Sequence, residues 1–494
     1  MRRRQFLAAA SIAALPRVAL AAPNRDAELR AALDGLASLD TPTARLARLK
    51  GFDTASLSPS PRIDLETVRA GLAVDARLVA RFPIGKLGRS PYAVSPNAGA
   101  WREKDANAPR IDAETDQLRA DAARGVILPS PLLERTRKGV AEAAARASGP
   151  SADAFHRQAA SLADLAPRAP AEPGVSRFPG GADYFALLLE RHFGAAIAPA
   201  EAERQMLAAA RSLTARADTV LKRLGYTKGS VGARIRAAFR DPHFLYSDDD
   251  TGRDRALADM NSCLARVPSR LPALFGPLPP ECRNVSAVRM TRQEEAEGKQ
   301  GYRTVPTPST PGAYYPDLKR IRERPSWTLP AVVHHELLPG HMIQLPIEAA
   351  ADPHPLRLEY APAFAEGWAI YTEQLMAAEG AFAGDDHGLL GHLHWMLFRI
   401  GRGLVDTGVH IRQHSLAQTS EKLATLQGEA AYFAPMAQDI ERICIEPAMR
   451  AAEALTWLGL ARLGADARHK GLETLRKFHR ETLANGRRRF AMLS

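Results

Sequence analysis

The chain has 494 residues, of which 46% are hydrophobic and 24% are charged. These proportions are typical of a globular protein and exclude a disordered chain, a collagen and a small disulfide-stapled protein. The formal net charge is +11, but four of these charges are arginines within the first 21 residues, and the other Lys and Arg residues are scattered. We therefore expect no nucleic-acid partner, because a surface that binds nucleic acid needs a concentrated basic patch.

The first 21 residues have the three parts of an export signal. Arg2–Arg4 precede a short apolar stretch, Phe6–Leu15, and Ala19-Leu20-Ala21 forms an A-x-A cleavage site. The run Arg3-Arg4-Gln5-Phe6-Leu7 resembles the twin-arginine export motif. The apolar stretch is about half the length that spans a bilayer, so we expect a periplasmic or otherwise exported protein with no stable membrane insertion after cleavage. A retained anchor and an ordinary secretory signal are the alternatives.

The rest of the chain is predicted to be mainly helical. Ala, Leu, Arg and Glu dominate it, and apolar residues recur every three or four positions, which is typical of helices with one buried face. Thirty-six prolines indicate many connecting segments between the helices. The clearest helical patterns lie at 26–38, 131–147, 183–193, 200–223, 254–272 and 438–463.

Other patterns interrupt these helices. The Pro- and Gly-rich stretch 166–180 is the best candidate for a boundary between an N-terminal helical region, 22–175, and a C-terminal catalytic region, 176–494, and one continuous domain is the alternative. Val285–Val288 and Tyr302–Val305 are predicted to be two short strands around a charged loop. We therefore predict a mainly α fold with a small β element just before residue 331.

The three cysteines, Cys263, Cys282 and Cys444, form no C-x-x-C pair. An oxidising compartment would permit a disulfide between Cys263 and Cys282. Buried free thiols are an equally good interpretation, and the sequence leaves both open.

Residues 331–344, AVVHHELLPGHMIQ, contain a candidate metal site. The neutral imidazoles of His335 and His341 suit zinc, and the carboxylate of Glu336 could activate a water molecule. In the usual H-E-x-x-H spacing both histidines lie on one helical face, but here they are six residues apart, which is about 240° around a straight helix. Pro339-Gly340 lies between them, and we expect it to bend or break the helix and return His341 to the metal.

His334 is a third histidine beside this pair. It shares a helical face with His341 but lies about 10 Å from it along an ideal helix. The spacing allows three interpretations of His334: a metal ligand, a hydrogen-bond donor behind the ligands, or a packed core residue.

A further ligand is expected downstream. In the helix-like segment FAEGWAIYTEQL, residues 364–375, Glu366 falls 25 residues after His341. Helical zinc peptidases with a glutamate ligand carry it on a separate helix at roughly that separation, although Glu366 taken alone would be read as a surface carboxylate. Two histidines, one glutamate and one open position describe a catalytic zinc site. Glu373 shares a helical face with Glu366 and is expected to orient a histidine.

These segments together resemble the bacterial domain-of-unknown-function family 885, whose hallmark is H-E-x-x-P-G-H followed by E-G-W-A-x-Y. Further similarity lies in Gly180–Phe185, Gly312–Tyr315 and Val405–His410, so the resemblance runs from about residue 180 to residue 463. The family is similar to helical gluzincin peptidases such as thimet oligopeptidase and carboxypeptidase Taq. The resemblance implies a large helical zincin-like fold with an enclosed cleft.

One segment departs from the family pattern, which continues with R-Y and then P-G-Q-A-L-x-Y. In the corresponding segment, 442–450, Arg442 and Pro447 fit the pattern, but the Gly, the Gln and the Tyr are missing. We expect these positions to line the site, so that substrate preference or activity differs from the family. The three ligands and Glu336 are intact.

The predicted chemistry is hydrolysis of an amide bond by water. Glu336 is expected to take the proton of that water and pass it to the leaving amine, while zinc polarises the carbonyl. The oxyanion needs a donor besides the metal, and the candidates, each with packing as its alternative role, are in order Tyr315, His410 and Tyr371. Three arginines could hold a peptide carboxylate or form structural ion pairs, namely Arg399, Arg402 and Arg442.

We therefore expect an exported zinc metallopeptidase that acts on small peptides. A zinc amidase or esterase with a non-peptide substrate is the first alternative, because the same water could attack another acyl group. A binding protein that retains the fold without catalysis is the second alternative, and the missing residues in 442–450 slightly favour it.

Overall fold

The computed structural model describes residues 23–430 and 436–493. The expected signal peptide, 1–21, lies outside the described residues. Within the part of the chain that is described, no helix is both long enough and apolar enough to cross a bilayer.

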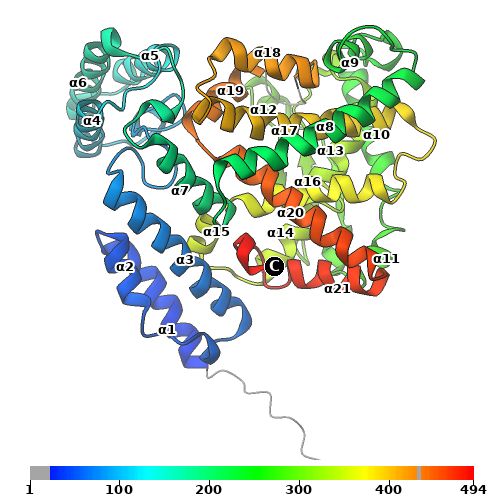
Figure 1. The fold of residues 1–494 in the computed structure, drawn as a ribbon, viewed down its shortest axis with the longest axis horizontal. Helices are drawn as coiled ribbons and strands as arrows, with labels where there is room; N and C mark the ends of the chain where they lie inside the picture. Colours follow the sequence, from blue (N-terminus) through cyan, green and yellow to red (C-terminus); the bar gives the residue numbers. More distant parts are fainter. Residues whose placement is uncertain (1–22, 431–435, 494) are drawn as a thin grey trace, which may run out of the picture.

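The fold is mainly α-helical, as predicted (Figure 1). Many of the helices carry a proline in their first turn, where the missing N–H costs no hydrogen bond. Some prolines therefore start helices, and others lie in connecting segments, as those between residues 305 and 311 do. The first six helices are α1 Pro23–Asp34, α2 Pro42–Leu49, α3 Pro59–Arg81, α4 Ala108–Ala123, α5 Ser130–Arg146 and α6 Gly149–Leu165.

The later helices form most of the larger body on the right of Figure 1, while α4–α6 stand together at the upper left and α1–α3 at the lower left. Six helices precede the motif region: α7 Gly181–Phe193, α8 Pro199–Arg223, α9 Val231–Phe239, α10 Asp250–Leu264, α11 Leu271–Phe275 and α12 Arg292–Ala296. The motif region and the C-terminal part contain α13 Leu329–Glu336, α14 His341–Ala350, α15 Pro355–Tyr360, α16 Ala363–Ala378, α17 Asp386–His410, α18 Leu416–Gln427, α19 Met436–Ile445, α20 Met449–His469 and α21 Leu472–Leu483.

Helix α17 is the central element of the larger body. It packs against α8, α16, α18 and α20, and nearly all of its residues are buried. A helix buried on all sides must be apolar or must pair its polar groups internally. Accordingly, its buried Arg402 pairs with Asp439, with 3.1 Å between Nε and Oδ2.

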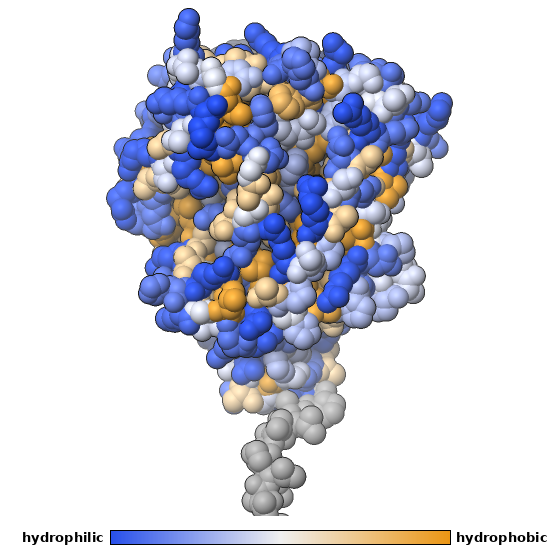
Figure 2. All heavy atoms as spheres, turned by 90° about the vertical axis from the view of Figure 1, so that its right-hand side faces the viewer, coloured by the Kyte–Doolittle hydropathy of each residue, from blue (hydrophilic) through white to orange (hydrophobic). Residues whose placement is uncertain are grey.

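Two groups of buried residues hold the molecule together. The main core contains side chains from Val74 to Phe490, so it draws on both sides of the boundary expected near residue 176, and that boundary stays a prediction. A smaller core joins α1–α3 to α15 and includes Leu33, Leu65 and Tyr360. On the face shown in Figure 2, hydrophilic side chains predominate and hydrophobic ones are scattered between them, as on an ordinary globular surface.

A small sheet precedes the motif helix. Its strands are β1 Val285–Ala287, β2 Tyr302–Thr304 and β3 Gly312–Tyr315, in the order β1-β3-β2. β1 runs parallel to β3, and β2 runs antiparallel to it. The two strands expected from the sequence are present, but the central strand β3 was not predicted, because four residues between prolines give almost no periodic signal.

The three cysteines are all buried free thiols. Of the two interpretations that the sequence allowed, the structure thus shows the free thiols and no disulfide between Cys263 and Cys282.

Candidate metal centre

The motif helix breaks where Pro339-Gly340 was expected to break it. α13 ends at Glu336 and α14 begins at His341. A Cβ atom on Gly340 would lie 1.9 Å from the carbonyl oxygen of His335, so only glycine fits this close approach. The break brings the rings of His335 and His341 to a centroid distance of 4.9 Å, nearly perpendicular to each other.

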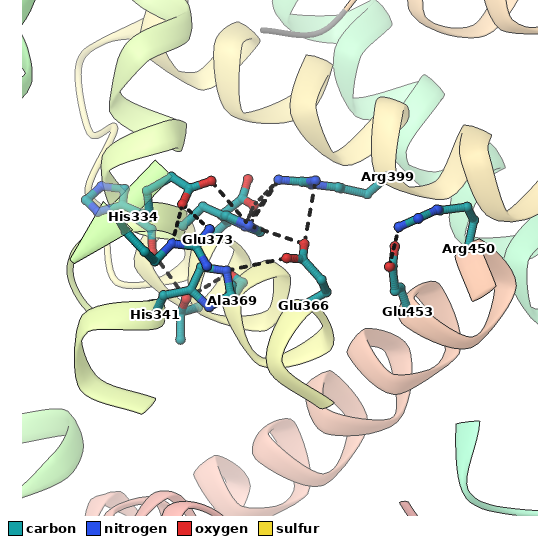
Figure 3. A network of polar contacts seen from close by, with 12 residues as sticks. His334, His341, Glu366, Ala369, Glu373, Arg399, Arg450 and Glu453 are labelled. Carbon is teal, nitrogen blue, oxygen red and sulfur yellow. Dashed lines mark hydrogen bonds and ion pairs between the residues drawn. The ribbon is translucent and has the colours of Figure 1, made fainter. Parts of the chain in front are cut away.

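Helix α16 brings Glu366 to these two histidines. Oε2 of Glu366 lies 3.4 Å from Nε2 of His335, and Oε1 lies 3.5 Å from Nε2 of His341. One ligand atom from each of the three residues lies within 4.8 Å of the others. Figure 3 shows the carboxylate of Glu366 directed between His341 and Arg399.

The three side chains are of the kinds that zinc binds, and they lie close enough together to share one ion. Ligand atoms held at about 2.0–2.1 Å from a tetrahedral ion are separated by about 3.4 Å. Each oxygen of Glu366 lies at about this separation from one histidine nitrogen, and one donor atom from each of the three residues lies within 4.8 Å of the others. Both ring nitrogens of His341 are buried and make no hydrogen bond to any described residue. A buried imidazole without partners is costly, and a bound metal would satisfy it.

A second carboxylate fixes the orientation of His335. Nδ1 of His335 lies 2.7 Å from Oε1 of Glu373, and both side chains are almost fully buried. This contact holds Nε2 of the ring toward Glu366, which is the arrangement that commonly orients a ligating histidine. The role expected for Glu373 is thus compatible with the geometry.

The charge states of the cluster are set by burial and by mutual contacts. Burial would raise the pKa of Glu366, but contacts with His335 and His341 outweigh it and hold this pKa well below its usual range. Burial lowers the pKa of His341 to about 4. Burial and Arg399 would lower the pKa of His335, but its contacts with Glu366 and Glu373 outweigh them and raise it. Glu366 and His341 are therefore in the forms that bind a metal ion, whereas His335 would have to release any proton it carries when a metal binds.

Glu336, the expected proton acceptor, lies at the end of α13 beside this cluster. Its Oε1 atom is 4.0 Å from Nε2 of His335, and its Oε2 atom accepts hydrogen bonds from Nε and Nη2 of Arg303. Burial would raise the pKa of Glu336, but Arg303 and the nearby histidines outweigh it, so the pKa is lowered and the carboxylate is ionised. Arg303 comes from β2, and no sequence signal showed which way its side chain would point.

Arg399 of α17 pairs with two carboxylates, that of Glu366 in the cluster and that of Glu373 behind it. Its Nη1 atom lies 3.9 Å from Glu366, and its Nη2 atom lies 3.7 Å from Glu373. Arg399 is therefore part of an ion-pair network, which was one of its two expected roles. Figure 3 also shows the separate pair of Arg450 and Glu453 beyond Arg399.

The side chain of Tyr315, the first candidate oxyanion donor, lies on the other face of the sheet from Arg303. Tyr315 pairs with Tyr302 across β3 and β2, and their rings stack at a centroid distance of 4.4 Å. Arg303 pairs with Tyr314 instead, so these two side chains share the opposite face. Because Arg303 contacts Glu336, Tyr314 shares the face of the sheet that meets the site, and Tyr315 lies on the other face. The donor role of Tyr315 stays a prediction.

His410 and Tyr371, the other two candidate donors, make their polar contacts away from the cluster. Nδ1 of His410 accepts a hydrogen bond from the backbone N–H of Val175, and Nε2 donates to the carbonyl of Ile443 at 2.9 Å. The Tyr371 hydroxyl lies 2.7 Å from Nε2 of His479. Both side chains thus have the packing role that was their alternative, because their polar atoms are already engaged away from the cluster.

His334 is not part of the three-residue cluster either. Its Nδ1 atom lies 3.2 Å from the carbonyl oxygen of Leu338, and its ring meets the ring of Phe382 edge to face. In Figure 3 it points to the side opposite Glu366. Of its three interpretations, the packed core residue fits.

Comparison with known proteins shows which family the chain belongs to. A family model matches residues 96–493. The chain belongs to that family, which is described as "Bacterial protein of unknown function (DUF885)". The match begins well before residue 180, where the resemblance expected from the motifs started. No curated protein matches the chain.

Two solved structures share the fold of this DUF885 chain. A "putative lipoprotein" from Colwellia psychrerythraea is 22% identical, with a TM-score of 0.75, and the match covers 95% of this chain and 88% of that one. A "putative lipoprotein of unknown function" from Shewanella oneidensis is 16% identical, with a TM-score of 0.66, and the match covers 94% and 91% of the two chains. At these identities the likeness concerns the fold alone.

The departure from the family pattern also has a structural counterpart. Ala448 stands where the family pattern has glycine, and its φ of 69° lies in the left-handed region that favours glycine. Both carboxylate oxygens of Asp406 accept backbone N–H groups at this point, from Ala448 at 2.9 Å and from Ala451 at 3.0 Å. Asp406 thus anchors the start of α20 even though the glycine is missing.

Proposed function

We propose that the protein is an exported, zinc-dependent metallopeptidase that hydrolyses short peptides. The observation that carries the proposal is the convergence of His335, His341 and Glu366, whose donor atoms lie within 4.8 Å of one another, with the carboxylate of Glu336 beside them. Two histidines and one glutamate leave a position open for water or substrate, as in catalytic rather than structural zinc sites.

The proposed roles of the residues follow from their contacts. When bound, zinc would polarise a carbonyl group and acidify water at the site. His335, His341 and Glu366 would hold the ion, and Glu373 would keep His335 in its ligating orientation. Glu336 would accept the proton from the attacking water and deliver it to the leaving amine.

Burial of the site favours small substrates. The side chains of His335 and His341 are 3% and 1% exposed, and that of Glu366 is 32% exposed. Ligands this deeply buried are more accessible to a short peptide than to a folded protein. Export is supported by the signal pattern in residues 1–21 and by the description of both structural neighbours as "putative lipoprotein".

The proposal is tested with a library of short peptides and the variant Glu336→Gln. We expect the wild type to cleave peptides and Glu336→Gln to lose about 10²–10⁴-fold in kcat while keeping its metal, because only the proton acceptor is removed. Equal turnover by Glu336→Gln would contradict the assigned role. Cleavage of esters or non-peptide amides without any cleavage of peptides would favour the alternative hydrolase.

A further inference from the structure

The guanidinium of Arg303 is only partly engaged by its ion pair with Glu336. Two of its nitrogens, Nε and Nη2, donate to a single carboxylate oxygen, Oε2. Its third nitrogen, Nη1, makes no hydrogen bond to the residues that the structure describes, and 29% of the side chain is exposed. Because a guanidinium carries five N–H donors in a fixed plane, the end formed by Nη1 and Nη2 remains available to a second carboxylate.

The sheet holds this arginine in a fixed place. Tyr302, the preceding residue, stacks on Tyr315, and its hydroxyl donates to Oε1 of Glu294 at 2.7 Å. On the other side, Oγ1 of Thr304 accepts the backbone N–H of Ala313 at 3.1 Å. The backbone on both sides of Arg303 is therefore tied to its neighbours, so the guanidinium is positioned before any substrate binds.

The charges around the site also favour an anionic substrate group. Three carboxylates, those of Glu336, Glu366 and Glu373, face the two guanidinium groups of Arg303 and Arg399. A bound divalent cation would add two positive charges to this set of three carboxylates and two guanidinium groups. The occupied site would therefore attract an anion, and Arg303 is the more exposed of its two arginines.

We propose that Arg303 selects peptides that carry a carboxylate close to the bond to be cleaved. This inference rests on the proposed function. Glu336 separates Arg303 from the metal ligands, with contacts of 3.0 Å to Nε of Arg303 and 4.0 Å to Nε2 of His335. An extended peptide spans about 3.5 Å per residue, so a carboxylate on Arg303 lies within about two or three residues of the ligands. A free carboxyl terminus and an acidic side chain both meet this requirement.

The test is a binding titration that needs no turnover. The full-length chain is titrated by calorimetry with a short N-acetylated peptide whose N-methylated peptide bonds resist hydrolysis. The peptide is used as the free acid, as the C-terminal amide, and as the amide with aspartate in its last position. We expect the wild type to bind at least one carboxylate form about tenfold more tightly than the plain amide, because a bidentate contact to arginine is strong and geometrically specific.

Variants assign this preference to Arg303. Arg303→Met should bind all three peptides equally, and Arg303→Lys should keep a reduced preference, because an ammonium group lacks the planar fork. Arg322→Met, which removes an exposed arginine just before the motif helix, is the matched control and should behave as the wild type. Circular dichroism and zinc content show whether each variant remains folded.

The outcomes separate this inference from the proposed function. A preference for the free acid or for the aspartate peptide that disappears in Arg303→Met supports the inference and identifies the source of the carboxylate. A wild type without a preference, or an Arg303→Met variant that keeps it, overturns the inference even if peptides are cleaved. A wild type that shows the preference but cleaves no peptide overturns the proposed function alone.

Discussion

The buried histidines of two regions differ in what their ring nitrogens contact. At the break between α13 and α14, His335 and His341 converge on carboxylates, and both nitrogens of His341 are without a hydrogen bond to the described residues. At the end of α17, His410 uses both nitrogens on backbone groups, and His479 of α21 contacts the carbonyl of Leu274 and the hydroxyl of Tyr371.

This difference shows how a candidate ligand can be recognised among buried histidines. Packed histidines such as His410 and His479 satisfy their nitrogens within the fold, since a buried polar atom without a partner is costly. Unsatisfied nitrogens alone do not mark a ligand, because those of His192 and His392 are also buried without a partner among the described residues, and neither histidine belongs to the cluster. A histidine whose nitrogens are buried, unsatisfied and directed at a carboxylate keeps a place for an ion. The predictions below test whether the two regions differ in function as they do in contacts.

The largest effect on the metal site is expected from Gly340→Ala. Its Cβ would lie 1.9 Å from the carbonyl oxygen of His335, so the break must shift and His341 must move from Glu366. We expect loss of bound zinc and a decrease of about 1–3 kcal/mol in the free energy of unfolding, measured by elemental analysis and urea denaturation. Gly35→Ala is the control, because a Cβ there meets nothing within 4 Å. A Gly340→Ala variant with full zinc content would contradict the account of the break.

His410→Ala is expected to separate stability from metal binding. It leaves the N–H of Val175 and the carbonyl of Ile443 without their partner and opens a cavity, so the free energy of unfolding should fall by about 2–4 kcal/mol. Zinc content should remain that of the wild type. If His410→Ala lost zinc while its stability was unchanged, the distinction between the two regions would be wrong.

The pH dependence of stability sharpens the comparison. Burial lowers the pKa of His392 to about 3, and burial lowers the pKa of His394 and His410 to about 4. Below about pH 6.5 these histidines bind protons in the unfolded chain but stay neutral in the folded protein. The contribution of these histidines to the free energy of unfolding is therefore complete above about pH 6.5. It falls toward pH 4, by up to about 1.4 kcal/mol per pH unit for each histidine.

Denaturation at a series of pH values checks this slope. His392→Leu removes one such residue, so its stability should fall less steeply between pH 6.5 and pH 4 than that of the wild type. His156→Leu replaces an exposed histidine and should leave the slope unchanged. Identical slopes for His392→Leu and the wild type would show that His392 is protonated in the folded state.

The smallest effect is expected from Ala448→Gly. Glycine adopts the left-handed backbone without strain, which should raise the free energy of unfolding by about 1–2 kcal/mol. Its greater freedom in the unfolded chain should lower the free energy of unfolding by about 0.4–1 kcal/mol. We therefore expect a small net stabilisation, measured by urea denaturation, whereas Ala452→Gly inside α20 should destabilise by about 1 kcal/mol. A clear loss of stability in Ala448→Gly would mean that the buried Ala448 methyl contributes more than its strained backbone costs.

Much of the fold followed from local sequence patterns. The 3.6-residue periodicity gave the mainly helical class, and Pro339-Gly340 marked the break of the motif helix. The strand β3 was missed because Gly312–Tyr315 is short and lies between prolines. Without β3, the sequence could not show which tyrosine lies beside Arg303. The pairing of β2 with β3 shows that it is Tyr314 and not Tyr315.

The candidate site was predictable where residues are near in sequence or fall in a known motif. The proposed ligands and Glu336 were suggested by their spacing together with the similarity to helical zinc peptidases, and the side chains of His335, His341 and Glu366 do lie together. Glu373 was expected to orient a histidine, and it contacts His335. Arg303 was not identified, because a three-residue strand does not reveal which face turns inward. His410 and Tyr371 were placed near the oxyanion by motif membership alone, which carries no information on the direction of a side chain.

The most direct test of the account is the zinc content of the purified protein beside His335→Ala and Glu366→Ala. Since three ligands form a single site, we predict about one zinc ion per wild-type chain and essentially none in either variant. All three proteins should be compared at equal purity, with circular dichroism to show that they are folded. A folded wild type that contains no zinc and takes up none when it is added would contradict the central claim.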